Sequence, residues 1–155
     1  MKMNITKFVV AFTVFLNVPI VVQAVEHTHE HDGQSELKLN HNKKWQIDNS
    51  LHIGMNGIKK EIMMNLDAIH YDKFSQKQYI TIARKIDSQL SYLFKNCKLP
   101  PQADAQLHIL LANIMQGSEL MKSSEAPKQG AIKIIQSLND YPQYFNDPAW
   151  QGLKH

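Results

Sequence analysis

The paired prolines at positions 100 and 101 constrain the fold more than any other feature of the sequence. A proline has no backbone N–H and its ring clashes with the preceding helical turn, so a helix that runs toward Pro100 must end before it. The φ angle of Pro101 suits the first residue of a new helix. Residues 96–108 therefore predict a corner between two helices, with Cys97 at the end of the first and His108 two turns into the second.

Apolar residues recur at spacings of three and four in four segments, which is typical of helices that bury one face. The first helix is expected over residues 48–70, capped by Asp48 or Ser50. Gly54 and Gly57 either permit the close approach of a neighbour or mark a loosened first turn. The second helix is expected from Ser75, because Ser75 and Gln78 make a capping box. The residues expected to point inward are Leu51, Met55, Ile58, Ile62, Leu66 and Ile69 in the first helix, and Tyr79, Ile82, Ile86, Leu90, Leu93 and Cys97 in the second.

The third helix is expected from Pro101 to about residue 121, and the fourth from near Ser124 until Pro142 ends it. Residues 144–150 form an aromatic tail that should fold back on the helices. Four helices joined by short loops, with no strand pattern, predict an all-α fold, an antiparallel up-down-up-down four-helix bundle. The inward residues of the last two helices are Leu107, Leu110, Leu111, Ile114, Met121, Ile134, Ile135, Leu138 and Tyr141.

The first 24 residues are typical of a secretory signal peptide, with a positively charged start, an apolar run over residues 8–22 and a small residue, Ala24, before the cleavage point. Asn17 and Pro19 interrupt the apolar run, which argues against a membrane anchor. We therefore expect residues 1–24 to be a signal peptide, 25–44 a flexible His-rich lead, 45–150 the bundle and 151–155 a C-terminal tail. Within the lead, residues 37–40 are expected as an extended strap and residues 40–43 as a turn.

The charge of the chain excludes some classes of partner. Its 17 Lys and Arg residues against 14 Asp and Glu give a formal net charge of +3, which falls to +1 when cleavage removes Lys2 and Lys7. No basic block remains, so nucleic acid is not an expected partner. A single cysteine forms no internal disulfide. We expect a soluble periplasmic protein, not inserted in the membrane after cleavage, whose partners are a metal ion and another periplasmic protein.

The first candidate site is the run of alternating histidines after the expected cleavage point. His27, His29 and His31 stand among acidic residues, and imidazole nitrogens suit Cu(II), Zn(II) and Ni(II). The ordinary interpretation is a solubilising segment that binds metal only because any histidine cluster does. The leading hypothesis is nevertheless an accessory protein that binds or buffers copper or zinc through this lead.

A second, soft site is predicted at one end of the bundle, from His52, Met55, Cys97 and His108. Thiolate, thioether and imidazole together suit Cu(I). Trp45 and Trp150 are expected at the same end. The ordinary interpretation, which we favour, is that Met55 and Cys97 fill the core and that His108 pairs with Asp104 one turn away. We expect Cys97 to be buried, reduced and structural.

Two further alternatives are a protein-interaction module, which would use a helix face or the aromatic end of the bundle, and a non-covalent haem-binding bundle. Haem held by Met55 and His108 is the weakest of these, and the chain has no Cys-x-x-Cys-His for covalent attachment. We expect no enzymatic activity, because the sequence offers neither paired Glu-x-x-His motifs nor an oxyanion hole beside Cys97.

Several local motifs carry a family resemblance over residues 37–150. They are Trp45 before Gly54-Met55, the Asn96-Cys97-Lys98-Leu99 corner before Ala103-Asp104-Ala105 and Leu107-His108, and Asn139-Asp140-Tyr141 followed by Trp150. With these motifs the chain resembles a small, poorly characterised group of exported proteobacterial helical-bundle proteins with a His-containing lead. The resemblance implies the fold and the compartment, and no biochemical role. The bundle also resembles b562-type cytochromes, although no histidine stands on the fourth helix.

Overall fold

The computed structural model describes residues 36–153, and this part of the chain is all-α apart from one pair of two-residue strands. None of the helices in the described residues is long and apolar enough to cross a membrane. In chain order the elements are β1 (Trp45–Gln46), α1 (Asn49–Met63), α2 (Leu66–His70), α3 (Gln76–Asn96), α4 (Pro101–Lys122), α5 (Pro127–Tyr144) and β2 (Phe145–Asn146).

The helix starts predicted from local motifs are confirmed. Asp48 caps α1 by accepting a hydrogen bond from the Leu51 amide at 2.7 Å, and Ser75 with Gln78 forms the complete capping box of α3. The paired prolines separate α3 from α4, with Pro101 as the first residue of α4. The second carboxylate oxygen of Asp48 accepts from the Lys98 amide at 2.7 Å, so the cap of α1 also fixes the corner between α3 and α4.

The prediction of one helix over residues 48–70 is wrong, because the structure divides it into α1 and α2. Asn65 stands at the break, with φ −122° and ψ 3°, and its side-chain amide donates to the Glu61 carbonyl at 2.8 Å. Asparagine competes in this way with the backbone ladder and disfavours a continuous helix. The predicted inward residues are buried on both sides of the break, including Leu66 and Ile69.

The predicted limits of the last helix are also wrong. It begins at Pro127 rather than near Ser124, because the residue before a proline disfavours helical backbone and proline itself suits the first helical position. It continues through Pro142 to Tyr144. Pro142 removes one hydrogen bond of the helical ladder, but only two residues of α5 follow it, and the buried ring of Tyr141 holds that last turn against the core.

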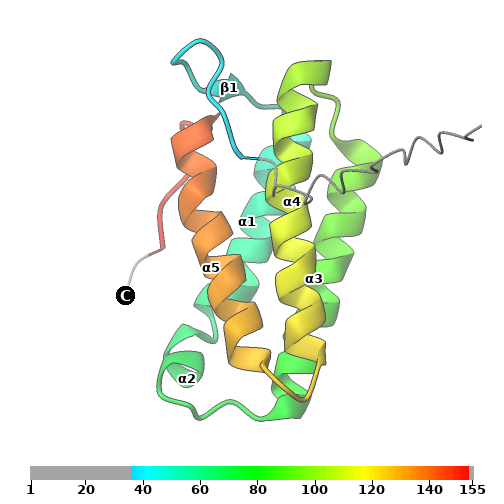
Figure 1. Ribbon diagram of the computed structural model, residues 1–155, viewed down its shortest axis with the longest axis vertical. Helices are drawn as coiled ribbons and strands as arrows, with labels where there is room; N and C mark the ends of the chain where they lie inside the picture. The colour runs from blue at the N-terminus through cyan, green and yellow to red at the C-terminus, as the bar shows by residue number, and fades with distance from the viewer. Residues whose placement is uncertain (1–35, 154–155) are drawn as a thin grey trace, which may run out of the picture. The chain divides into compact units, whose positions relative to one another are not determined.

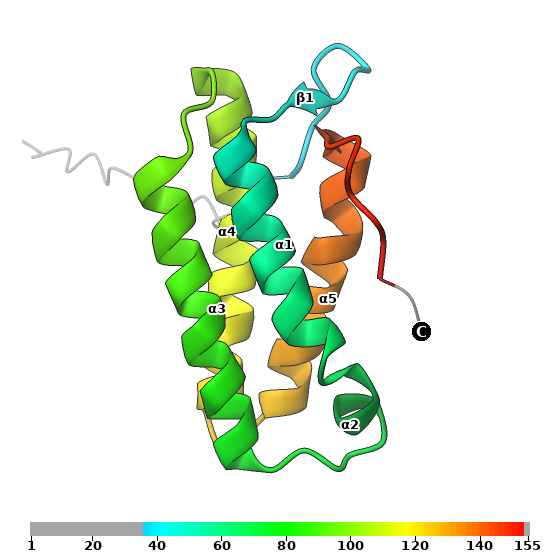
Figure 2. The ribbon, with the colours of Figure 1, turned by 180° about the vertical axis from the view of Figure 1, so that it is seen from behind.

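The four long helices lie side by side around one core, with α1 against α3, α3 against α4 and α4 against α5 (Figures 1 and 2). The helices α4 and α5 approach closely at Gly117 and Gly130, since a Cβ built on Gly117 would lie 2.7 Å from the Gly130 carbonyl oxygen. Gly54 permits the predicted close approach in the same way, because a Cβ there would lie 2.5 Å from Cγ of Leu93.

The segment before β1 lies on the helices as the predicted strap and turn. Leu37 packs against the core, and the amide of Lys38 donates to Oε1 of Gln106 on α4 at 2.7 Å. Asn40 and Lys43 exchange backbone hydrogen bonds of 2.8 and 2.9 Å around the turn. The folded part therefore includes residues 36–44, which the sequence assigned to the flexible lead. The pairing of β1 with β2 is parallel, with Trp45 opposite Phe145, and no strand was predicted there.

Candidate functional site

A histidine and an aspartate from distant parts of the chain meet at the end of the molecule where α1 begins and α5 ends. Nδ1 of His52, one turn into α1, lies 2.9 Å from Oδ2 and 3.0 Å from Oδ1 of Asp147. The Asp147 side chain is 2% exposed and the His52 side chain 32% exposed. Since an aspartate that is almost fully buried needs donors, this geometry favours the His52 tautomer with its proton on Nδ1.

Two further donors complete the surroundings of the Asp147 carboxylate. The hydroxyl of Tyr141 donates to Oδ2 at 3.1 Å, and the amide of Ala149 donates to Oδ1 at 3.2 Å. Burial of the Tyr141 ring, followed by the nearby negative charge of Asp147, raises the pKa of the Tyr141 phenol. Tyr141 therefore stays a neutral donor, and the carboxylate joins α1, α5 and the segment after β2.

The C-terminal segment continues over α1 from this pair. Nζ of Lys59 lies 4.1 Å from the centre of the Trp150 ring and donates to the Gln151 carbonyl at 2.7 Å. The Trp150 ring packs edge-on against Tyr141, with 4.7 Å between the centroids. The prediction that the aromatic tail folds back on the helices is confirmed by these contacts and by the burial of Phe145.

Cys97 lies near this cluster but is only partly buried, so the prediction of a buried thiol is wrong in degree. It follows the last residue of α3, where the chain leaves the helix toward Pro100, and the packing around it is less complete than along α3 itself. Desolvation raises the pKa of the Cys97 thiol to about 12, and the negative charges of Asp48 and Asp104 contribute in the same direction. The thiol is therefore protonated at neutral pH and is a poor nucleophile and a poor metal ligand.

The four residues of the predicted soft site lie in different surroundings. Met55 is fully buried in the core, and His52 is bonded to Asp147. The His108 side chain is 58% exposed, with Nε2 3.7 Å from the Asp104 carboxylate and its ring packed edge-on against Phe94. The pairing of His108 with Asp104 follows the ordinary interpretation of the sequence. Among residues 36–153, no three His, Cys, Asp or Glu side chains are grouped so that they could hold a metal ion.

The first candidate site, formed by His27, His29 and His31, lies outside the described residues, as does the expected signal peptide. The described residues begin at Glu36, nine residues after His27 and five after His31. The structure therefore gives the point where the lead joins the folded part and leaves the geometry of its histidines as a prediction.

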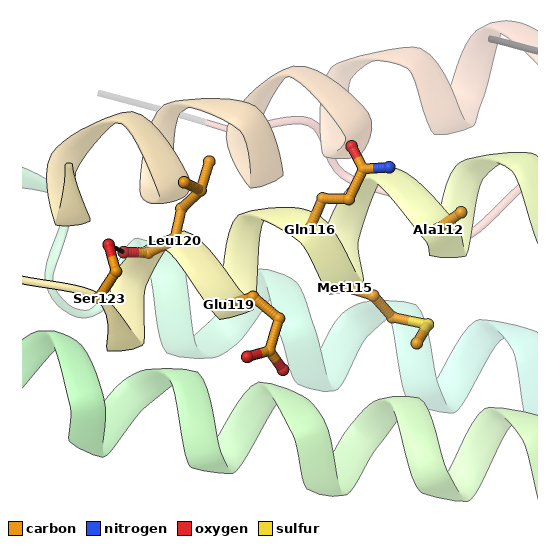
Figure 3. A pocket seen from close by; sticks show the side chains of 6 residues that line it. All are labelled: Ala112, Met115, Gln116, Glu119, Leu120 and Ser123. Atoms are coloured by element: carbon orange, nitrogen blue, oxygen red, sulfur yellow. Dashed lines mark hydrogen bonds between the residues drawn. The ribbon is translucent and has the colours of Figure 1, made fainter. Parts of the chain in front are cut away.

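A second feature is an apolar face on the solvent-exposed side of α4. Met115 is 44% exposed and Leu120 37% exposed, and both line one groove. Figure 3 shows that Gln116 and Leu120 extend from one side of α4, and that Met115 and Glu119 extend from the other. Phe94 of α3, 51% exposed, lines an adjoining groove with Met115. Neighbouring exposed apolar residues are typical of interaction surfaces, so this face is the one that the protein-interaction alternative requires.

The sequence placed His52 at the correct end of the molecule, but it did not indicate Asp147 as its partner or Tyr141 as a second donor to that carboxylate. The pair spans 95 residues, and no local spacing connects them. One local signal was present, because Asp147 precedes Pro148 and an aspartate at such a position often accepts from an amide two residues later, as it does from Ala149.

Comparison of the chain with models of protein families, with curated proteins and with solved structures found no match.

Proposed function

We propose that the protein is an exported, non-catalytic accessory protein that binds copper or zinc through His27, His29 and His31. The observation that carries the proposal is the placing of three imidazoles at alternate positions in one short stretch, with Glu30 between two of them and Glu26 and Asp32 on either side. Neutral imidazole is the commonest ligand for these ions, and three nitrogens on one chain can converge on one ion. The composition of the lead suits both metals and selects neither.

The attachment of the lead to the helices supports this proposal. The Lys38 amide is held by Gln106, and the indole N–H of Trp45 donates to the Lys38 carbonyl at 2.7 Å. A histidine at position 31 is thus only seven residues from a fixed point on α4. The folded part acts as a carrier that presents the lead.

Two further parts of the proposal concern fold and location. The carrier is an antiparallel up-down-up-down four-helix bundle, which the neighbour relations of α1, α3, α4 and α5 support. The protein is soluble in the periplasm after cleavage behind Ala24, and it belongs with the exported helical proteins that its motifs resemble. N-terminal sequencing of protein from a periplasmic extract should give Val25 as the first residue, and circular dichroism should show more than half helix.

Titration calorimetry with Cu(II) and with Zn(II) tests the metal site. The variant with His27→Gln, His29→Gln and His31→Gln should lose at least about tenfold in affinity, as should a deletion of residues 25–34. The matched control carries His41→Gln and His108→Gln, two exposed histidines of the described part, and should bind as the wild type does. Equal binding by the lead variant and the control would exclude the lead as the site and leave the α4 face as the alternative.

A further inference from the structure

We propose that residues 148–153 form a latch, which undocks from α1 and α5 as one unit while the helices stay folded. The latch covers the ring of Tyr141 and the side chain of Lys59 when it is closed. Its hinge is the step from Asp147 to Pro148, since the Asp147 carboxylate is held by His52 of α1 and Tyr141 of α5, whereas the third donor to it, the Ala149 amide, belongs to the latch itself.

The way in which this segment is attached supports independent opening. Backbone hydrogen bonds of the segment are local, as from the Trp150 amide to the Asp147 carbonyl, and within the described residues none joins it to a helix. Within the described residues, its hydrogen bond and its cation–π contact with α1 both come from Lys59, which holds the Gln151 carbonyl and the face of Trp150. Segments held by few contacts of this kind open locally at lower free energy than helices of the core do.

Two polar groups destabilise the closed state of the latch and so reduce the free-energy difference between the closed and the open state. The indole N–H of Trp150 is buried, and it has no hydrogen-bond partner within the described part of the chain. An open latch returns this donor to water, which satisfies it. Burial also lowers the pKa of the Lys59 ammonium, against the opposing effect of Asp147, so that closing removes part of the hydration of this charge.

The favourable terms are the aromatic contact of Trp150 with Tyr141, the contacts of Lys59 with Trp150 and the Gln151 carbonyl, and the packing of Leu153 against the core. A closed state with good apolar contacts and poorly satisfied polar groups is the arrangement expected of a lid that opens and closes. Opening exposes the edge of the Tyr141 ring and the Lys59 ammonium together, so the latch controls access to this surface.

Exchange of the Trp150 indole proton with solvent, followed by NMR on the full mature chain, tests the latch. The resonance is assigned with Trp150→Phe. Because undocking exposes little surface, the exchange rate of the indole proton should change little with urea below the unfolding transition, whereas protected amides of α3 and α4 should exchange with a steep urea dependence.

A Lys59→Gln variant removes the charge and the contact with Trp150, and it should raise the exchange rate of the Trp150 indole proton at least about fivefold. The matched control is Lys85→Gln, which removes an exposed lysine paired with Glu61 and should leave that rate unchanged. The latch is excluded if indole exchange shows the same urea dependence as the core amides. It is also excluded if Lys59→Gln changes the rate no more than Lys85→Gln does.

Discussion

The carboxylate of Asp147 and the imidazole of His52 are bonded at 2.9 Å although 95 residues separate them in the chain. This contact links α1 to the segment after α5 at the end of the molecule where Cys97 and the aromatic residues Tyr141 and Trp150 lie. The acceptor, the Asp147 carboxylate, is almost fully buried, so its removal should affect stability more than the loss of a surface ion pair.

An Asp147→Asn variant should unfold more easily by about 1–3 kcal/mol, because the amide supplies one acceptor oxygen where three donors now converge. Urea unfolding at pH 7 measures the change. Asp72→Asn is the control, since it removes an exposed partner of Lys128 and should cost less than about 1 kcal/mol. Equal losses in the two variants would mean that the buried carboxylate contributes no more than a surface charge.

A Tyr141→Phe variant keeps the buried ring and removes only the hydroxyl that donates to Asp147. The expected loss is about 1 kcal/mol of unfolding free energy. The combination with Asp147→Asn should cost less than the sum of the two single changes, because both act on one hydrogen bond. Strict additivity in this double-mutant cycle would contradict the contact.

The raised pKa of Cys97 predicts a loss of stability at alkaline pH. Below pH 8 the thiol is protonated in both the folded and the unfolded chain, so it contributes no pH dependence. Above the ordinary thiol pKa the unfolded chain loses the proton, while the folded chain keeps it until about pH 12. The wild type should therefore lose more stability between pH 8 and pH 10.5 than Cys97→Ala does, as measured by urea unfolding at both values.

Thiol labelling of the native protein provides an independent readout of Cys97. The reaction at pH 7 should be slow and should accelerate on denaturation, because the reactive species is the thiolate. Fast native labelling that Cu(I) blocks would instead support the soft metal site with Met55 and His108.

A Gly130→Ala variant tests the close approach of α4 and α5. The added Cβ would lie 2.6 Å from the backbone nitrogen of Met121, and a backbone atom cannot move aside cheaply. We expect a net loss of about 1–3 kcal/mol, although alanine alone would favour the helix by about 1 kcal/mol. Gly152→Ala, whose Cβ meets nothing within 4 Å, should leave the unfolding free energy unchanged.

The sequence predicted the long helices well where local chemistry decides them. The spacing of apolar residues identified the buried face of α1, and the Ser75 capping box identified the start of α3. The predictions were wrong where a tertiary contact overrides the local preference of a residue. Pro142 was expected to end α5, but the burial of Tyr141 holds the turn that contains it.

The candidate site was predictable only in part for a related reason. The position of His52 follows from helical periodicity and the length of α1, whereas its pairing with Asp147 depends on how the chain after α5 returns to α1. That return has no periodic signal. The break in the first predicted helix at Asn65 likewise depends on whether the Asn65 side chain forms a hydrogen bond with a backbone carbonyl or with solvent, which no sequence pattern indicates.

The parallel pair of β1 and β2 joins residues on either side of the helices α1 to α5, and the side chains of Gln46 and Asn146 that form a hydrogen bond across it are 100 residues apart. Closing a loop of that length costs about 1 kcal/mol more than closing a helical hairpin of some 25 residues, at about 0.6 kcal/mol per doubling. The hydrogen bonds of two-residue strands are too few to offset this cost of loop closure while the helices are unformed. The strand pair therefore forms after the helices have assembled. Substitutions at Gln46 or Asn146 should therefore speed unfolding and leave the folding rate almost unchanged.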